Sequence, residues 1–222
     1  MAKGSGGKTG YHHGDLRNAL IGAAVELAVE GGPERVVLRE AARRVGVSPT
    51  AAYRHFSGHG DLLWQVKARG QQALAAFMLE AVSEVPPLPD PGEEAERRLA
   101  AIGRGYVRFA VENPGLYRTA FRRIPADAPG ADGVRAAFTG SAPPGDEPRY
   151  SAFRVLTDTL DAAVAAGRMP PAARPGAEIA AWAAVHGLAQ LLLDGPLAGL
   201  PAGQWEALTD RTVRMVVAGL LG

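Results

Sequence analysis

The 222-residue chain contains no cysteine. This absence excludes a disulfide framework, a thiol nucleophile and a cysteine-ligated metal site, and it is typical of proteins in a reducing compartment. No run of about 18 apolar residues occurs, so we expect no transmembrane helix. The N-terminal stretch MAKGSGGKTGYHHGD has lysines but lacks the apolar segment of a secretory signal. These absences predict a cytoplasmic protein with no membrane partner.

Motifs for catalysis and cofactor binding are also missing from the sequence. No Gly-rich phosphate loop follows a strand pattern, and no Glu-x-x-His pair is present. No nucleophile has a convincing general base beside it in a known arrangement. We therefore expect no catalytic residues, no cofactor and no metal site.

The chain carries a net charge of only +1, but its charges are unevenly distributed. Residues 1–72 hold ten Lys and Arg against six Asp and Glu, whereas residues 73–222 hold fourteen against seventeen. A basic first part beside an acidic remainder indicates a polyanionic partner for the first part alone.

Helical periodicity dominates what is present. Apolar residues recur at spacings of three and four, and Gly, Pro and capping residues divide the chain into segments. No alternating strand pattern and no internal repeat is found, so the fold class is all-α. We expect about nine helices, at residues 15–31, 38–45, 49–56, 60–85, 92–113, 114–121, 147–167, 175–194 and 202–221.

These segments predict two functional parts. A tail at 1–10 precedes a helix-turn-helix domain at 11–58, and a connecting helix at 59–85 leads to a larger helical domain at 86–222. Within that domain residues 125–148 are rich in Pro, Gly and Asp, which favours a long loop.

The stretch RRVGVSPTAAYRHFSG, residues 43–58, carries the signals of a helix-turn-helix. Gly46 can adopt the left-handed conformation that ends a helix. Ser48 is a suitable N-cap and Pro49 a suitable first helical residue for the next helix. Ala52 and Phe56 are four residues apart, so they share the face that packs into the core. The pattern predicts two short helices joined by a tight turn.

The other side chains of the second helix suit the major groove of DNA. Thr50 offers a hydroxyl and a methyl group, and Ala51 permits close approach. Tyr53, Arg54 and His55 can reach base edges or phosphate oxygens. A helical hairpin with an ordinary polar face is the alternative interpretation. The cap, the turn and the charge asymmetry together favour DNA binding.

The segments YHHGDLRNALIGAAVELAVEGG, LREAARRVGVSPTAAYRHFSG and DLLWQV resemble the DNA-binding domain of the TetR (tetracycline repressor) family over residues 11–66. The resemblance implies a three-helix DNA-binding domain and a larger, variable helical domain that binds small molecules and dimerises. It also implies that the turn and the recognition helix contact the operator, with supporting phosphate contacts. The implied DNA-binding residues are Arg39, Ser48, Pro49, Thr50, Ala51, Tyr53, Arg54, His55 and His59.

Two positions depart from the family pattern. The family often has a threonine that caps the supporting helix and contacts phosphate where this chain has Val37, which can do neither. It commonly has a lysine where this chain has His59. Because a histidine carries less positive charge than a lysine at neutral pH, we expect a weaker, pH-sensitive phosphate contact there.

The segment AWAAVHGLAQL resembles a Trp-x-x-x-His-Gly (WHG) signature of one subclass of TetR C-terminal domains, and ENPGLYRTAF resembles its preceding short helix. Trp182 and His186 are neighbours on one helical face. His186 is either a polar anchor in a ligand pocket or a hydrogen-bonded core histidine, and both interpretations stay open. The residues predicted to line a pocket are Tyr106, Phe109, Tyr117, Phe121, Phe153, Trp182 and His186.

The last two expected helices have the composition of a symmetric dimer seam. Each carries an apolar stripe, and small residues within the stripe permit close helix approach. The predicted interface residues are Ala181, Ala184, Val185, Leu188 and Leu192 on the first helix, and Trp205, Leu208, Thr212, Met215, Val216 and Gly219 on the second.

From the residues and the resemblance we predict a homodimeric, ligand-responsive transcriptional repressor that binds a palindromic double-stranded DNA operator and is released by a small molecule. The alternative is a helical small-molecule-binding protein or enzyme that has lost DNA recognition. Val37 and His59 favour the alternative, whereas the intact segment Ser48–Phe56 opposes it.

Overall fold

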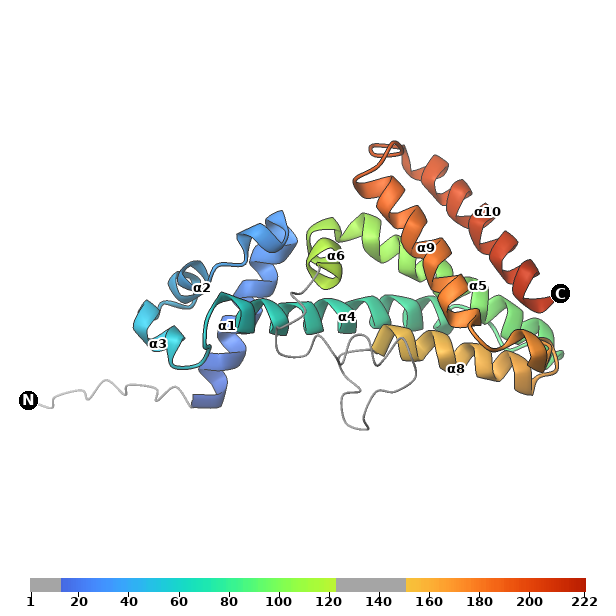
Figure 1. Cartoon of the computed structure of the whole chain (residues 1–222), viewed down its shortest axis with the longest axis horizontal. Helices are drawn as coiled ribbons and strands as arrows, with labels where there is room; N and C mark the ends of the chain where they lie inside the picture. The colour runs from blue at the N-terminus through green and yellow to red at the C-terminus, as the bar shows by residue number, and fades with distance from the viewer. Residues whose placement is uncertain (1–12, 123–150) are drawn as a thin grey trace, which may run out of the picture.

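The computed structural model describes residues 13–122 and 151–222, and all regular elements within these ranges are helical (Figure 1). The described part has nine α-helices and two 3-10 turns, which confirms the all-α class. The expected tail at 1–10 and the expected loop at 125–148 lie outside the described residues.

A small bundle forms the N-terminal end of the molecule. It consists of α1 (His13–Gly31), the 3-10 turn η1 (Pro33–Arg35), α2 (Leu38–Val45) and α3 (Pro49–Tyr53). Leu20, Leu27 and Leu38 are buried between these elements. Ala52 and Phe56 are buried with them, which confirms that these two residues form the inner face of the recognition segment.

The recognition helix is shorter than the sequence predicted. We expected it to continue to about Phe56, but α3 ends at Tyr53 and the chain continues as a turn through Arg54 and His55. Phe56 still enters the core after the helix has ended, with 1% of its surface exposed. The four-residue spacing of Ala52 and Phe56 therefore predicted the burial of Phe56 correctly, but it did not predict where the helix ends.

The long helix α4 (His59–Ser83) connects the two parts of the molecule (Figure 1). It starts beside α3 and packs against α1 at its N-terminal end. Farther along it packs against α5, α6 and α8. The helix ends shortly before the proline-rich segment at 86–91, because proline lacks the backbone N–H that would continue it.

The remaining helices form the larger C-terminal part. They are α5 (Pro91–Glu112), α6 (Pro114–Phe121), α8 (Ser151–Ala165), the 3-10 turn η3 (Pro171–Ala173), α9 (Ala177–Leu193) and α10 (Ala202–Leu221). All of these α-helices lie within a few residues of their predicted bounds. The helices α9 and α10 lie side by side at one edge of the molecule (Figure 1).

The short helix α6 joins the C-terminal part to the N-terminal bundle. Gly115 packs so tightly against the end of α1 that a Cβ atom there would overlap the Ala28 carbonyl oxygen and lie 2.8 Å from that of Val29. Arg122, just after α6, pairs with Glu34 of η1 at 2.7 Å. Lys67 donates to the Arg122 carbonyl oxygen at 2.8 Å. Burial lowers the pKa of Lys67 to about 8.

In the part of the chain that the structure describes, no helix is both long enough and apolar enough to cross a membrane.

Candidate DNA-binding surface and ligand cavity

The turn between α2 and α3 has the geometry that its sequence predicted. Gly46 ends α2 in the left-handed conformation, at φ 78° and ψ 27°. Ser48 caps α3, because its Oγ accepts a hydrogen bond from the Ala51 backbone N–H at 3.2 Å. Val47 packs against the core between them. This local geometry aims the first turn of α3 outward.

All nine residues predicted to contact DNA lie at the surface. Ala51 and His55 are half-buried, and the other seven are exposed. Tyr53 is 49% exposed, which is unusual for an aromatic side chain in a folded domain. The exposed residues are Arg39, Ser48, Pro49, Thr50, Tyr53, Arg54 and His59.

Val37 leaves the start of α2 without a side-chain cap, as predicted, and is itself 44% exposed. His59 is the first residue of α4 and is exposed beside the end of the recognition segment. Both departures from the family pattern therefore lie on the predicted contact surface.

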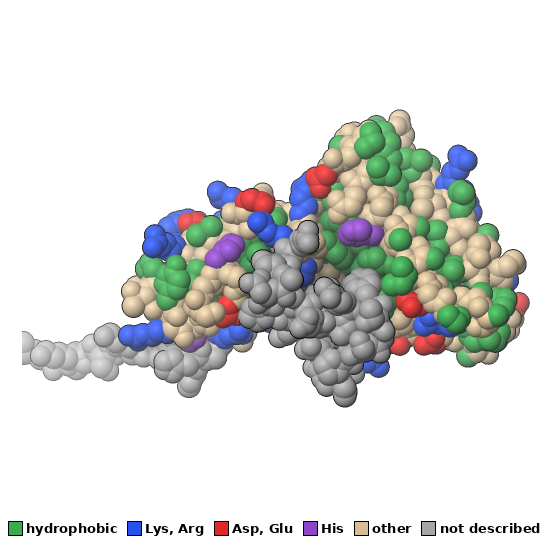
Figure 2. Space-filling view, in the orientation of Figure 1, with side chains coloured by type: hydrophobic (Ala, Val, Ile, Leu, Met, Phe, Trp, Pro, Cys, Tyr) green, Lys and Arg blue, Asp and Glu red, His purple; other side chains and the backbone are tan. Residues whose placement is uncertain are grey.

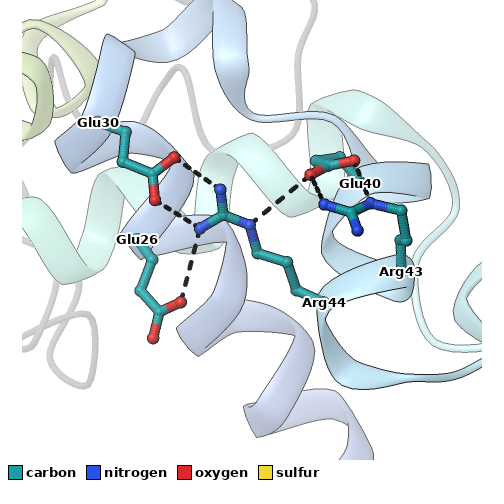
Figure 3. Close-up of polar contacts among 5 residues, drawn as sticks. All are labelled: Glu26, Glu30, Glu40, Arg43 and Arg44. Atoms are coloured by element: carbon teal, nitrogen blue, oxygen red, sulfur yellow. Dashed lines mark hydrogen bonds and ion pairs between the residues drawn. The ribbon is translucent and has the colours of Figure 1, made fainter.

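Several acidic side chains of the bundle form ion pairs with arginines (Figure 3). Arg44 of α2 binds Glu30 of α1 through two hydrogen bonds, of 2.7 and 2.6 Å, and approaches Glu26 at 3.7 Å. Arg43 makes two hydrogen bonds to Glu40 within α2, of 2.9 and 2.7 Å. The hydrogen bonds from Arg44 and Arg43 lower the pKa values of Glu30 and Glu40, respectively. The network joins α1 to α2 and neutralises these carboxylates.

Other arginines of the bundle remain available to a ligand. Among the described residues, Arg17, Arg39 and Arg54 have no carboxylate partner. The Arg17 guanidinium lies 5.1 Å from the centre of the Phe56 ring, in cation–π contact. Figure 2 shows Lys and Arg side chains over the bundle, among a few acidic ones. Arg17 is not among the residues predicted from the sequence to contact DNA, because only the folded bundle brings the start of α1 to Phe56.

The predicted pocket residues form a mutually packed aromatic cluster. Tyr106 of α5 contacts Tyr117 and Phe121 of α6 and Trp182 of α9, with ring centroids 5.2 to 6.1 Å apart. Phe153 of α8 lies 5.7 Å from Trp182. His186 and Phe109 also contact the cluster. The structure therefore brings all seven predicted residues together.

Three polar atoms meet inside this cluster. The Nδ1 atom of His186 lies 2.8 Å from both the Tyr106 and Tyr117 hydroxyl oxygens, which are 3.4 Å from each other. When Nδ1 is unprotonated, its single lone pair can accept a hydrogen bond from either of the two hydroxyls. Burial lowers the pKa of His186, and it raises the pKa of Tyr106 well above its ordinary value and that of Tyr117 to about 12. All three groups are therefore neutral near pH 7.

This neutral histidine predicts a loss of stability at low pH. Because burial depresses its folded-state pKa, the unfolded chain binds a proton first as the pH falls below about 6.5. The stability it supports is present above that pH and is lost below it. We expect His186→Gln, which cannot become charged, to lose less stability than the parent between about pH 7.5 and pH 5.5. Urea unfolding at both pH values measures this, and equal losses in both proteins would contradict it.

A small apolar cavity of about 30 Å³ lies beside the aromatic cluster. Five helices meet around it: α4, α5, α8, α9 and α10. Of the seven residues predicted to line a pocket, Tyr106 and Trp182 border it. It is lined by Met78, Leu99, Ile102, Gly103, Tyr106, Leu156, Ala181, Trp182, Val185, Val213, Val216 and Val217.

A broader groove of about 480 Å³ runs between the end of α4, α5 and α10. Both of its arginines are in ion pairs: Arg104 binds Asp210 at 2.7 Å, and Arg108 binds Glu80, which does not line the groove, at 3.1 Å. A charged ligand would have to displace these pairs. Within the described ranges, no three His, Cys, Asp or Glu side chains cluster in a way that could hold a metal ion.

The predicted dimer stripe on α9 needs correction. Ala181, Val185, Leu188 and Leu192 are 7–8% exposed, because they face the interior of the same chain. Trp205 and Val216 of α10 also pack against that interior. The sequence did not distinguish the faces because α9 is apolar around most of its circumference. Of the predicted residues, Ala184, Leu208 and Thr212 are half-buried, and Met215 and Gly219 are exposed.

Comparison with known proteins agrees with this architecture. Residues 20–66 match the family model described as bacterial regulatory proteins, tetR family, and residues 99–216 match the tetracyclin repressor-like C-terminal domain. A curated relative, the uncharacterized HTH-type transcriptional regulator YobS of Bacillus subtilis (strain 168), is 26% identical over 111 residues. That match covers 50% of this chain and about half of the relative, 54%.

Solved structures have the same fold. A protein of unknown function from Rhodococcus sp. RHA1 is 27% identical, with a TM-score of 0.72 over 97% of this chain and 100% of that one. A tetR-family regulatory protein from Rhodococcus RHA1 is 20% identical, with a TM-score of 0.56 over 92% of this chain and 96% of that one. The WHG subclass of the C-terminal part stays a prediction. With an N-terminal helix-turn-helix and a C-terminal domain that both match its models, the chain belongs to the tetR family of bacterial regulatory proteins.

Proposed function

We propose that this regulator is a homodimeric repressor that binds a near-palindromic operator and is released from it by a small molecule. The observation that supports it most directly is the outward surface of α3 and its flanking turns. That surface combines a capped helix start, exposed polar tips and arginines without carboxylate partners. In the cytoplasm, where we place the protein, its partner would be double-stranded DNA.

The contacts divide into two kinds. Thr50 and Tyr53, which are exposed on α3, would contact base edges in the major groove. Arg39 in the first turn of α2, and Arg17 over the Phe56 ring, would contact phosphates that border that groove. His59 would add a weaker phosphate contact from α4.

Substitutions should separate the two kinds of contact. Arg39→Ala is expected to weaken binding to all duplexes alike and to reduce the salt slope by about one. Thr50→Ala is expected to relax preference at particular base pairs, with about 1–3 kcal/mol lost at each. Fluorescence anisotropy with operator and mismatched duplexes at several salt concentrations measures both effects. If both variants bind every duplex as the parent does, the groove assignment is wrong.

A revised dimer seam uses the outer faces of α9 and α10. Ile179 and Leu191 of α9 are each 44% exposed, and Met215 of α10 is 67% exposed. Small exposed residues lie between them, Ala183 and Gly187, which allow close approach of a partner helix. A helix that is apolar on all sides is normally buried on all sides, and a partner copy would complete the burial of α9.

Release by a ligand is supported by how the parts connect. The aromatic cluster includes Tyr117 and Phe121 of α6, and α6 packs on the end of α1 through Gly115. A change around the cavity can therefore reach the DNA-binding bundle and the spacing of its two copies. The recognition helices must lie about 34–36 Å apart to enter successive major grooves.

The test of DNA binding is a gel shift of the full chain against randomised duplexes, with selection of the bound DNA. A repressor should enrich a near-palindromic sequence. If no duplex is retained at moderate salt, the protein is a small-molecule-binding protein or enzyme without DNA recognition.

A further inference from the structure

The cavity beside the aromatic cluster offers almost no polar group to a ligand. Of its lining residues, Tyr106 and Trp182 are the two whose side chains contain oxygen or nitrogen. The Tyr106 hydroxyl is already engaged, at 2.8 Å from His186 Nδ1 and 3.4 Å from the Tyr117 hydroxyl. The hydrogen-bonding requirement of Tyr106 is therefore met within the protein.

Among the residues that the structure describes, none that lines the cavity is charged. The nearest arginines along α5 are Arg104 and Arg108, and these bind Asp210 and Glu80 at the groove on another face of the helix. A carboxylate or ammonium group placed in the cavity would lose its hydration without gaining a counter-charge. An uncharged apolar group would gain contacts with aliphatic and aromatic side chains instead.

We propose that this cavity is the effector site and that it selects small, neutral, apolar molecules over carboxylates and amines. The inference rests on the proposed function, because it names the chemical class of the effector that releases the operator. His186 and Tyr117 are then positioning residues, which hold the Tyr106 ring against the cavity and do not contact the ligand.

The cavity is so small that its walls must move when a ligand binds. At about 30 Å³ it is smaller than a molecule of several carbon atoms, so a ligand must displace the side chains around it. At Gly103 of α5, a Cβ atom would lie 2.9 Å from Val213 Cγ2 of α10 and 3.7 Å from Val185 Cγ1 of α9. The three helices are thus in close contact at one wall, and a ligand there separates α5 from the two helices that carry the dimer seam.

The first experiment uses three probes of similar shape and different charge. Toluene, benzoate and benzylammonium are titrated into the full-length protein, and binding is measured by calorimetry and thermal shift. We expect toluene to bind at least about tenfold more tightly than either ion, because each ion is desolvated without a partner. Equal or tighter binding of benzoate or benzylammonium would overturn the inference.

A matched pair of variants locates the site. Ala181→Val adds two methyl groups at the cavity wall, whereas Ala76→Val makes the same change at an exposed position of α4, outside the cavity and the proposed dimer seam. We expect the first to weaken toluene binding by about tenfold and the second to leave it unchanged. Unchanged toluene binding in a folded Ala181→Val protein would place the site elsewhere.

A measurement on the unmodified protein covers the case in which Ala181→Val does not fold. On toluene titration, methyl NMR signals of Leu99, Ile102 and Leu156, which line the cavity, should shift more than those of Leu20 and Leu27 in the DNA-binding bundle. Shifts confined to the bundle would contradict the assignment.

Operator binding, followed separately by anisotropy, distinguishes failure of this inference from failure of the proposed function. Intact operator binding that responds to charged but not to neutral compounds overturns the effector class and leaves the regulator in place. Absence of operator binding to any duplex overturns the function, even if toluene occupies the cavity.

Discussion

Replacement of Gly115 by alanine is expected to destabilise the protein by about 1–3 kcal/mol or more and to weaken operator binding. The added Cβ atom would overlap the Ala28 carbonyl oxygen and lie 3.0 Å from the Gly32 amide nitrogen. Both are backbone atoms at the end of α1, so a rotamer change cannot relieve the overlap. Either α6 or the whole DNA-binding bundle must move.

Gly22→Ala is the matched control. Gly22 lies inside α1 on the exposed side, and a Cβ atom there meets nothing within 4 Å. Because alanine favours a helix over glycine, we expect this variant to gain about 0.5–1 kcal/mol. Urea unfolding of both variants measures the difference. If Gly115→Ala unfolds at the urea concentration of the parent, α6 is not in tight contact with α1 in solution.

The double variant Ile179→Asp, Leu191→Asp is expected to be monomeric and to lose about 100-fold or more in affinity for a palindromic operator. Both side chains are exposed on α9, so the charges should not disturb the core. In a symmetric dimer each charge would be buried without a partner in the seam. A monomer must also bind each half-site without the gain from a tethered second copy.

Leu79→Asp provides the comparison for this variant. Leu79 is 53% exposed on α4, away from the α9–α10 face, so its replacement should leave a dimer with parental affinity. Analytical ultracentrifugation and anisotropy are the two measurements. A double variant that still sediments as a dimer excludes this seam, and a monomer with parental affinity excludes the dimeric operator model.

The helix-turn-helix could be predicted because its signals are local. Gly46, Ser48 and Pro49 determine the turn and the start of α3 through their own backbone preferences and one side-chain hydrogen bond. The residue at which α3 ends could not be predicted in this way, because no local signal determines it. Phe56 reaches the core whether the chain is helical or turned, so its spacing could not establish where the helix stops.

In the C-terminal part, the sequence of a single helix did not determine which of its faces is buried. The sequence of α9 has more than one apolar face, and only packing against α5 and α10 shows that Val185 and Leu188 point inward. The hydrogen bonds that join Tyr106, Tyr117 and His186 connect residues up to 80 positions apart. The sequence predicted that these residues line one pocket. The hydrogen bonds among their side chains depend on the fold, which brings the three residues together.

The pairing of Glu26, Glu30 and Glu40 with arginines bears on how the protein finds its operator. Arginines engaged in this way add less to the attraction for arbitrary DNA, and in the described part of the bundle Arg17, Arg39 and Arg54 are arginines without a carboxylate partner. Association with random sequence should therefore be weak and short-lived, with brief sliding and frequent dissociation. Residence on the chromosome would then depend mainly on base contacts, so few molecules would be sequestered at the large excess of non-operator sites.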